Sequence, residues 1–320
     1  MKVKMLVNHV FLENLSKENL NERYDLANPE RYGAFRDVFG KNDFGFILAG
    51  DLEKEISSGI KAPVYVFGSD LYPSQHSEGV DCSLFLPSSF SFHKGVLPSV
   101  EGVYKIMDYL EGKRLAGDIK NIVNSKKATL SEDKISILDF QNQGFNTPKT
   151  FQAHSFEEFQ NLMENSDKDY VVKHRFGQEG RGLYMVNSQN IGVLKGLNLE
   201  DFIVQEKLNI LNEKRIIFFE GDFLGARIIH DRHMPWEQEG KVGRKHLTKK
   251  YIPSSEEIEN SKRILDQLDV TVGCIDWVNT VEKGETFLEY NGFGTGYGRG
   301  QYPYNLNRLV AERLKGCFSP

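Results

Sequence analysis

Short apolar runs and helix-spaced apolar positions divide the N-terminal third of the chain into elements. Runs that suit buried strands lie at 3–7, 45–49, 63–67 and 82–86. Because polar segments long enough for helices separate these runs, they favour a small α/β unit. Helix-spaced apolar positions follow at Val103, Ile106, Met107 and Leu110. The polar segment 113–130 then predicts a connection to the rest of the chain.

The same spacings predict helices and hairpins in the remaining two thirds. Strands are expected at 169–173, 183–186, 202–205, 215–219, 223–229, 272–281 and 286–290. Helices are expected at 155–164, 258–268 and 305–314, and from a capping Ser131 to Gly144. Residues 231–253 are expected to form a long, charged loop. We therefore predict an α/β N-terminal domain at 1–112, followed by α+β units at 113–205 and 206–320.

Composition narrows the class of protein. The chain has 320 residues, a hydrophobic fraction of 39%, a charged fraction of 27% and a net charge of −5. These values are typical of a globular protein and give no support to a nucleic-acid or anionic-membrane partner. No stretch approaches the roughly 20 apolar residues of a membrane span, and the first apolar run is too short for a signal peptide.

The cysteine count bears on the compartment. Cys82, Cys274 and Cys317 lie far apart and fit neither a metal nor a redox spacing. A sparse, odd number of cysteines suits a reducing environment. We expect a cytoplasmic protein, with a homodimer as the commonest possible assembly.

A glycine-rich hairpin is the first candidate for chemistry. The predicted strand 169–173 ends in Lys173, and the loop that follows carries Gly177, Gly180 and Gly182. Glycines allow backbone N–H groups to crowd around an anion, and a neighbouring lysine adds a positive charge. The pattern predicts a phosphate-binding loop; the alternative is a mobile turn.

A second hairpin carries two acids and an asparagine. If Lys283-Gly284 forms a two-residue turn, Asp276 lies opposite Asn291. Since side chains alternate between the faces of a strand, Glu289 and Asn291 share a face, and Asp276 lies on it. Two carboxylates and an amide oxygen predict a Mg²⁺ site. The alternative is a solvated polar face, but Asp276 stands in an apolar run, where an uncompensated acid is costly.

The phosphate hairpin followed by the metal hairpin resembles the ATP-grasp superfamily, in particular the branch of glutathione synthetase and the ribosomal-protein glutamate ligases. The resemblance extends from about Asp133 to Gly298. It implies an ATP-grasp fold, in which two α+β subdomains grip ATP behind a small α/β N-terminal domain. It also implies ATP and Mg²⁺, or Mn²⁺ in its place, as cofactors.

Site residues are carried over from this resemblance one by one. Lys134 and Lys173 would bind phosphates, and Gln205, Glu206 and Leu208 would lie at the hinge that reads adenine. Glu213 would bind ribose, and Arg215 would bind the nucleotide. Arg227 and Arg244 would face the transferring phosphate, together with Lys173. The metal ligands would be Asp276, Glu289 and Asn291.

Two further segments remain open between alternatives. Thr295 and Arg299 lie in a glycine-rich stretch that, by the resemblance, lies beside the substrate; a flexible connector is the alternative. Arg244 belongs to the basic run 241–250, which is either a loop that closes on an anionic substrate or a solvated run of charges.

The activity implied by the resemblance is ATP-dependent carboxylate–amine ligation through an acyl-phosphate. The substrates would be small-molecule or peptide carboxylates and amines. A kinase-like phosphotransferase of the same superfamily is one alternative. The other is an ATP-binding regulatory module without turnover.

Overall fold

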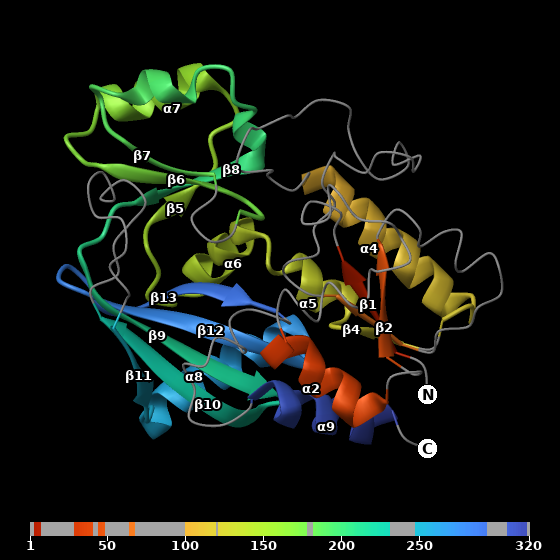
Figure 1. Ribbon diagram of the computed structural model, residues 1–320. Coiled ribbons are helices and arrows are strands. Elements are labelled where there is room, and N and C mark those ends of the chain that lie inside the picture. The colour runs from red at the N-terminus through yellow and green to blue at the C-terminus, as the bar shows by residue number, and fades with distance from the viewer. Residues whose placement is uncertain are drawn as a thin grey trace.

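The computed structural model describes residues 3–7, 29–40, 44–48, 64–67, 100–119, 121–177, 182–230, 247–292 and 306–318. Within these ranges the strands form three sheets. Figure 1 shows a small sheet above a large one, with the N-terminal sheet beside them. No helix in the described part of the chain is long and apolar enough to cross a membrane.

The N-terminal sheet is parallel and has the order β2-β1-β3-β4. Its strands are β1 (Val3–Val7), β2 (Phe44–Leu48), β3 (Val64–Phe67) and β4 (Asn121–Val123). The first three agree with the predicted runs, whereas 82–86 lies outside the described residues. The segment 113–130, which was expected to connect this unit to the rest of the chain, contains β4 and the short helix α5 (Lys126–Leu130).

Three helices accompany this sheet. They are α2 (Pro29–Phe39), α4 (Val100–Leu115) and, from the other end of the chain, α9 (Leu306–Phe318). The positions predicted to face the core from α4 are buried. Helices α2 and α9 pack against each other, so the two ends of the sequence meet in space (Figure 1).

The small sheet is antiparallel, has the order β5-β8-β6-β7, and is covered by α7 (Phe156–Glu164). Its strands are β5 (Thr150–Phe151), β6 (Tyr170–His174), β7 (Leu183–Val186) and β8 (Phe202–Glu206). Ser155 caps α7 by accepting a hydrogen bond from the Glu158 N–H. Phe159 and Met163 pack from α7 onto Val172 and Val204 of the sheet. This core holds Lys173 on a rigid strand.

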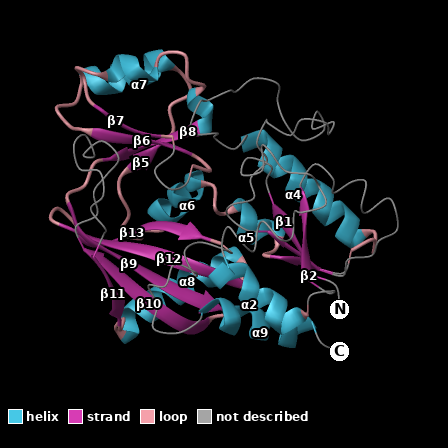
Figure 2. Cartoon of the chain, in the orientation of Figure 1, coloured by secondary structure: helices cyan, strands magenta, loops and turns pink. Residues whose placement is uncertain are grey.

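The large sheet is antiparallel, has the order β11-β10-β9-β12-β13, and is the broad sheet of Figure 2. Its strands are β9 (Ile210–Phe219), β10 (Asp222–His230), β11 (Leu247–Tyr251), β12 (Val272–Thr280) and β13 (Gly284–Asn291). Residues 247–251 were expected in a loop but form β11, because they pair with β10. The β9–β10 turn is tight, with positive φ at Glu220 and Gly221.

One face of the large sheet is covered by α8 (Ser255–Leu268). Ile264, Leu265 and Leu268 of this helix share a core with Ile216 and Ile275. Trp277 is in the same core and donates its indole N–H to Ser261 (2.8 Å). Since side chains alternate along a strand, the residues between these, including Arg215 and Asp276, belong to the opposite face.

The segment that joins the N-terminal unit to the small sheet begins its helix later than predicted. Asp133, rather than Ser131, is the cap: its carboxylate accepts the Ile135 N–H (3.1 Å) ahead of a 3-10 turn, Lys134–Ser136 (η6). Helix α6 (Ile137–Asn142) follows, and Gly144, with φ of 83°, ends it as predicted.

The register of the β12–β13 hairpin also differs from the prediction. Thr280 pairs with Gly284, so three residues form the turn, and Gly284 takes the positive φ (67°) that such turns require. A bulge between Asp276 and Trp277 then shifts the pairing. Asp276 therefore lies opposite Glu289, and Asn291 lies opposite Cys274. The predicted sharing of one face survives, because these shifts together move the pairing by an even number of residues.

A buried ionic cluster attaches α8 to the large sheet. The Lys214 ammonium donates to Glu257 of α8 and to Glu285 of β13, each at 2.6 Å. The Tyr251 hydroxyl also donates to Glu257 (2.7 Å). Burial opposes ionisation of Glu257, but hydrogen bonds from Lys214, from the Ser254 backbone and from Tyr251 outweigh it and hold its pKa at about 2.

We predict that Lys214→Met lowers the free energy of unfolding by about 3 to 5 kcal/mol, because it leaves the buried Glu257 carboxylate without its cation. Urea unfolding, followed by circular dichroism, measures this loss. Lys249→Met, at an exposed position of the same sheet, is the matched control. A loss below about 1 kcal/mol, as for a surface ion pair, would contradict the prediction.

Candidate nucleotide and metal site

A row of charged residues crosses the large sheet on the face that α8 leaves open. Arg227 of β10 pairs with Arg215 of β9, which pairs with Asp276 of β12, which pairs with Glu289 of β13. Neighbours in such a row project to the same side of the sheet. Strand pairing therefore brings four predicted site residues together from segments far apart in the sequence.

Asp276 is completely buried, and its charge is compensated within this row. The Arg215 guanidinium donates from Nε to Oδ1 (2.7 Å) and from Nη2 to Oδ2 (2.5 Å). Such a two-pronged pair is among the stronger side-chain interactions. Arg215, predicted to bind nucleotide, thus contacts a predicted metal ligand.

Asn291 completes the group of predicted metal ligands. Its Nδ2 donates to Asp276 Oδ2 (2.9 Å) and to Glu289 Oε1 (3.3 Å). One oxygen of each carboxylate therefore points at the same position, which the Asn291 amide nitrogen occupies. Two carboxylates and an amide that can turn its oxygen inward fit a hard divalent cation. No group of three or more His, Cys, Asp or Glu side chains in the described ranges is arranged for a metal; the predicted set has two acids and one amide.

The base of the glycine-rich loop faces this group from the small sheet. Lys134 donates from Nζ to the Gly177 carbonyl (2.5 Å) and lies 3.7 Å from Glu289 Oε2. Gly182 has φ of 65° and closes the loop where its carbonyl accepts the His174 N–H (2.8 Å). Residues of the predicted phosphate site and of the predicted metal site are thus joined by one lysine.

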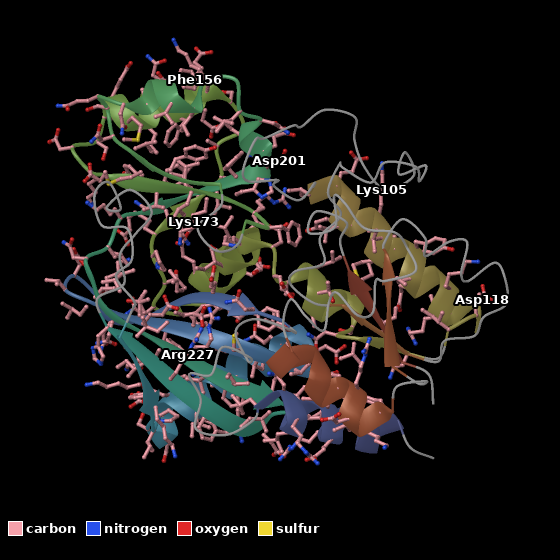
Figure 3. The ribbon with its side chains drawn as sticks, in the orientation of Figure 1. Lys105, Asp118, Phe156, Lys173, Asp201 and Arg227 are labelled. Atoms are coloured by element: carbon pink, nitrogen blue, oxygen red, sulfur yellow. The ribbon has the colours of Figure 1, made fainter. Side chains whose placement is uncertain are left out.

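A pocket lies between the two sheets at this point. Among the residues that line it are Lys134, Lys173, Ile203, Gln205, Phe287 and Glu289. Figure 3 shows Lys173 on the small sheet and Arg227 on the large one. The lining combines two lysines with three acidic residues, Glu132, Asp133 and Glu289, and with apolar walls. Lysines beside apolar walls suit a ligand that has both an anionic and a flat apolar part.

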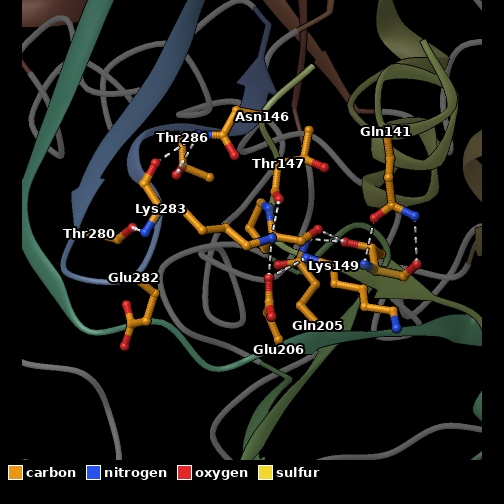
Figure 4. Close-up of polar contacts among 12 residues, drawn as sticks. Gln141, Asn146, Thr147, Lys149, Gln205, Glu206, Thr280, Glu282, Lys283 and Thr286 are labelled. Carbon is orange, nitrogen blue, oxygen red and sulfur yellow. Dashed lines mark hydrogen bonds and ion pairs between the residues drawn. The ribbon is translucent and has the colours of Figure 1, made fainter. Parts of the chain in front are cut away.

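Gln205 and Glu206 lie at the predicted hinge between the two sheets, and their side chains have different hydrogen-bond partners (Figure 4). Glu206 accepts the Lys149 N–H (2.8 Å) and forms an ion pair with Lys283 of the β12–β13 turn, so it fastens the two sheets together. Gln205 donates to Thr150 (2.9 Å), and its Oε1 is buried without a hydrogen-bond partner in the described part of the structure. A buried acceptor of this kind suits a ligand N–H. Leu208 follows between β8 and β9.

The remaining predicted residues divide into two groups. Glu213 is buried two residues before Arg215 on the same strand, 4.0 Å from its guanidinium. Arg227 is also buried. The others, Gly180, Arg244, Thr295 and Arg299, lie outside the described residues.

An ionic contact at the base of the glycine-rich loop was missed by the sequence analysis. Arg175 binds Asp133 through Nε (3.0 Å) and Nη2 (2.5 Å), and Tyr104 of α4 donates its hydroxyl to the same carboxylate (3.0 Å). Burial and the neighbouring Asp133 raise the pKa of Tyr104 to about 12. Because Asp133 precedes Lys134, this contact connects the N-terminal unit to the end of the pocket where Lys134 lies. Its members are far apart in sequence, and no local pattern indicates it.

His174, directly before Arg175, is also important to the loop. It is 4% exposed, and its Nδ1 accepts the Phe176 N–H (3.2 Å). Burial, and then the positive charges of Lys134 and Arg175, lower its pKa from 6.5 to about 3. The imidazole is therefore neutral at physiological pH.

We predict that His174 makes folding sensitive to acid. Below pH 6.5 the unfolded chain takes up a proton on this side chain and the folded chain does not until about pH 3. The free energy of unfolding therefore falls as pH decreases through this window, by up to about 1.4 kcal/mol per pH unit. In His174→Asn, whose Oδ1 can accept the Phe176 N–H, this component is absent. Urea unfolding of both proteins at several pH values measures it, and identical pH profiles would contradict it.

Comparison with known proteins agrees with this architecture at the level of fold. No protein-family model and no curated protein matches the sequence. Among solved structures, the chain is similar to D-cycloserine synthetase DcsG (TM-score 0.64, 12% identity, 100% of both chains). It is also similar to the ATP-grasp ligase PsnB complexed with a precursor variant, Mg and ADP (0.60, 13%, 98% of this chain and 97% of that one).

A third similar structure is D-alanine–D-alanine ligase from Bacillus anthracis complexed with ATP (TM-score 0.57, 12% identity, 98% of this chain and 95% of that one). At such identities the likeness concerns the fold alone. The likeness extends over nearly the whole of each chain, and in this chain it includes the two antiparallel sheets and the α/β unit. The chain has the ATP-grasp fold.

Proposed function

We propose that this protein is an ATP-dependent carboxylate–amine ligase that forms an amide or peptide bond. One observation supports the proposal: Lys134 contacts both the glycine-rich loop and Glu289, so the predicted phosphate site and the predicted metal site lie next to each other at a pocket. The motif Glu289-Tyr-Asn291 also supports the glutathione synthetase and ribosomal-protein glutamate ligase branch of the superfamily.

In the proposed reaction, an oxygen of the substrate carboxylate attacks the γ-phosphorus of ATP. The bond from this phosphorus to the bridging oxygen breaks, and ADP leaves. The nitrogen of an amine then attacks the acyl carbon. The bond between this carbon and the phosphate oxygen breaks, phosphate leaves with the electron pair, and the amine nitrogen loses a proton. The protein contributes by positioning the reactants and by neutralising negative charge.

The residues of the pocket have separate roles in this proposal. Lys134 and Lys173 offset the charge of the phosphates, and loop amides at Gly177, Gly180 and Gly182 surround them. Gln205 Oε1, buried and without a partner among the described residues, accepts the amino group of adenine. The Glu206 side chain is already bound to Lys149 and Lys283. We therefore propose that the backbone groups of Glu206 and Leu208 contact the adenine base.

On the large sheet, Glu213 binds ribose and Arg215 binds phosphate. Arg227, buried in the charged row, stabilises negative charge on the transferring group. Arg244 acts with it, and Thr295 and Arg299 contact the substrate. Asp276, Glu289 and Asn291 hold Mg²⁺, which when bound polarises the phosphate oxygens.

We propose that the protein is located in the cytoplasm, which is a reducing environment. Cys274 is buried and Cys317 is exposed, and both are free thiols. The substrates we propose are small-molecule or peptide carboxylates and amines.

The experiment that tests this function is an assay of ADP and phosphate release from Mg-ATP against amino-acid and peptide pools, with products identified by mass spectrometry. Acceptor-dependent ADP release, with a product heavier by one condensation, is the expected result. A phosphorylated product that forms without an amine would favour a phosphotransferase instead. ATP binding without turnover across all pools would favour a regulatory module.

We predict that Lys173→Ala raises the dissociation constant for ATP about tenfold or more, since a hydrogen bond from a charged group to phosphate contributes about 1.5 to 3 kcal/mol. Isothermal titration calorimetry with a non-hydrolysable ATP analogue measures this change. Lys168→Ala removes an exposed lysine just before the same strand and serves as control. Unchanged affinity in Lys173→Ala would remove this lysine from the phosphate site.

We also predict that Glu289→Gln raises the Mg²⁺ concentration needed for half-maximal turnover by at least about tenfold, because the site loses a charged ligand. A titration of Mg²⁺ at saturating ATP gives this value. Glu282→Gln, at the exposed tip of the same hairpin, should titrate like the wild type. Wild-type behaviour of Glu289→Gln at limiting Mg²⁺ would exclude Glu289 as a ligand.

A further inference from the structure

The predicted metal site already contains positive groups supplied by the protein. Arg215 binds both oxygens of Asp276, and Lys134 lies 3.7 Å from an oxygen of Glu289. Two carboxylates are thus matched by two cationic side chains. Asn291 adds a third donor, since its Nδ2 rather than its oxygen points at both carboxylates.

This arrangement opposes the binding of a divalent cation by itself. A cation that approaches Asp276 meets the Arg215 guanidinium on both oxygens and the N–H₂ group of Asn291 beside them. Asp276 is 0% exposed and Arg215 is 12% exposed, so water screens the repulsion between the cation and the guanidinium only weakly. For the metal to bind, Arg215 has to leave Asp276, and the Asn291 amide has to turn its oxygen inward.

Nucleotide phosphates would provide Arg215 with another partner. A guanidinium binds phosphate oxygens with the same two-pronged geometry that it uses for a carboxylate. Arg215 lies in the charged row between Arg227 and Asp276, on the face where the proposed function puts the phosphates. When Arg215 moves from Asp276 to a phosphate, both Asp276 oxygens become available to the metal.

We propose that Arg215 is a positioning residue that alternates between Asp276 and the nucleotide phosphates, so that the metal binds with the nucleotide and not before it. This inference rests on the proposed nucleotide site. It adds an order of binding that results from one ion pair of this chain. The pair keeps the buried carboxylate compensated while no nucleotide is bound.

The test measures metal binding directly, without turnover. Free Mn²⁺ is titrated by electron paramagnetic resonance into wild-type protein, Arg215→Gln and Lys250→Gln, each with and without ADP. Lys250 is exposed and belongs to the same cross-strand row, two strands from Arg215. Its substitution removes an equal charge without touching Asp276.

Without ADP, we expect Arg215→Gln to bind Mn²⁺ on the order of tenfold or more tightly than the wild type, because the repulsion between the guanidinium and the cation is removed at a buried site. Lys250→Gln should resemble the wild type. With ADP, the wild type should gain far more Mn²⁺ affinity than Arg215→Gln does. Equal Mn²⁺ affinities of wild type and Arg215→Gln without ADP would overturn the inference. An equal gain in Lys250→Gln would also overturn it, because net charge would then be the cause.

A second variant and a measurement of ADP binding distinguish misfolding, a wrong order of binding and a wrong proposed function. If Arg215→Gln does not fold, as judged by circular dichroism, Arg215→Lys replaces it. The lysine keeps the positive charge but cannot bind both Asp276 oxygens as the guanidinium does. A gain of at least a few-fold in Mn²⁺ affinity is expected. ADP binding to the wild type separates the two hypotheses. If Mn·ADP binds but the variants match the wild type, only the order of binding is wrong. If neither ADP nor Mn·ADP binds, the proposed function fails with it.

Discussion

The buried carboxylate of Asp276 imposes the strongest constraint on this structure. A carboxylate inside a sheet core is tolerated only when another group compensates its charge, and here Arg215 does so from the neighbouring strand. That pair requires β9 and β12 to lie side by side in one register. The same register aligns Arg227 and Glu289 with it, so compensation of one charge also assembles the candidate site.

The two faces of the large sheet use charge in different ways. On the face covered by α8, Lys214, Glu257 and Glu285 form a cluster that attaches the helix to the sheet. On the other face, Arg215, Asp276 and Asn291 are also paired with one another. They lie beside Glu289, which lines the pocket between the two sheets. Ion pairs therefore attach a helix on one face of the sheet, and on the other face an ion pair compensates a predicted metal ligand.

The small sheet and the N-terminal unit reach the same pocket through Lys134 and Asp133. Asp133 is held by Arg175 and Tyr104, and the adjacent Lys134 contacts the glycine-rich loop and Glu289. A shift of α4 would therefore change the position of Lys134 in the pocket. The synthetase DcsG, the ligase PsnB and D-alanine–D-alanine ligase have the same fold but are only 12–13% identical to this chain. Its function therefore follows from these residues and not from the fold.

Local sequence determined which side chains share a face of a single strand and where glycines free the backbone, because these features depend only on neighbouring residues. It was sufficient for Lys173 before its loop and for the common face of Glu289 and Asn291 on one strand. That Asp276 shares this face depends on how β12 pairs with β13. The three-residue turn, the bulge and the strand β11 were missed, since each depends on pairing. Only the tertiary structure decided that Arg215 binds Asp276 and that Arg175 binds Asp133, because those partners are 61 and 42 residues apart and meet only when separate elements pack together.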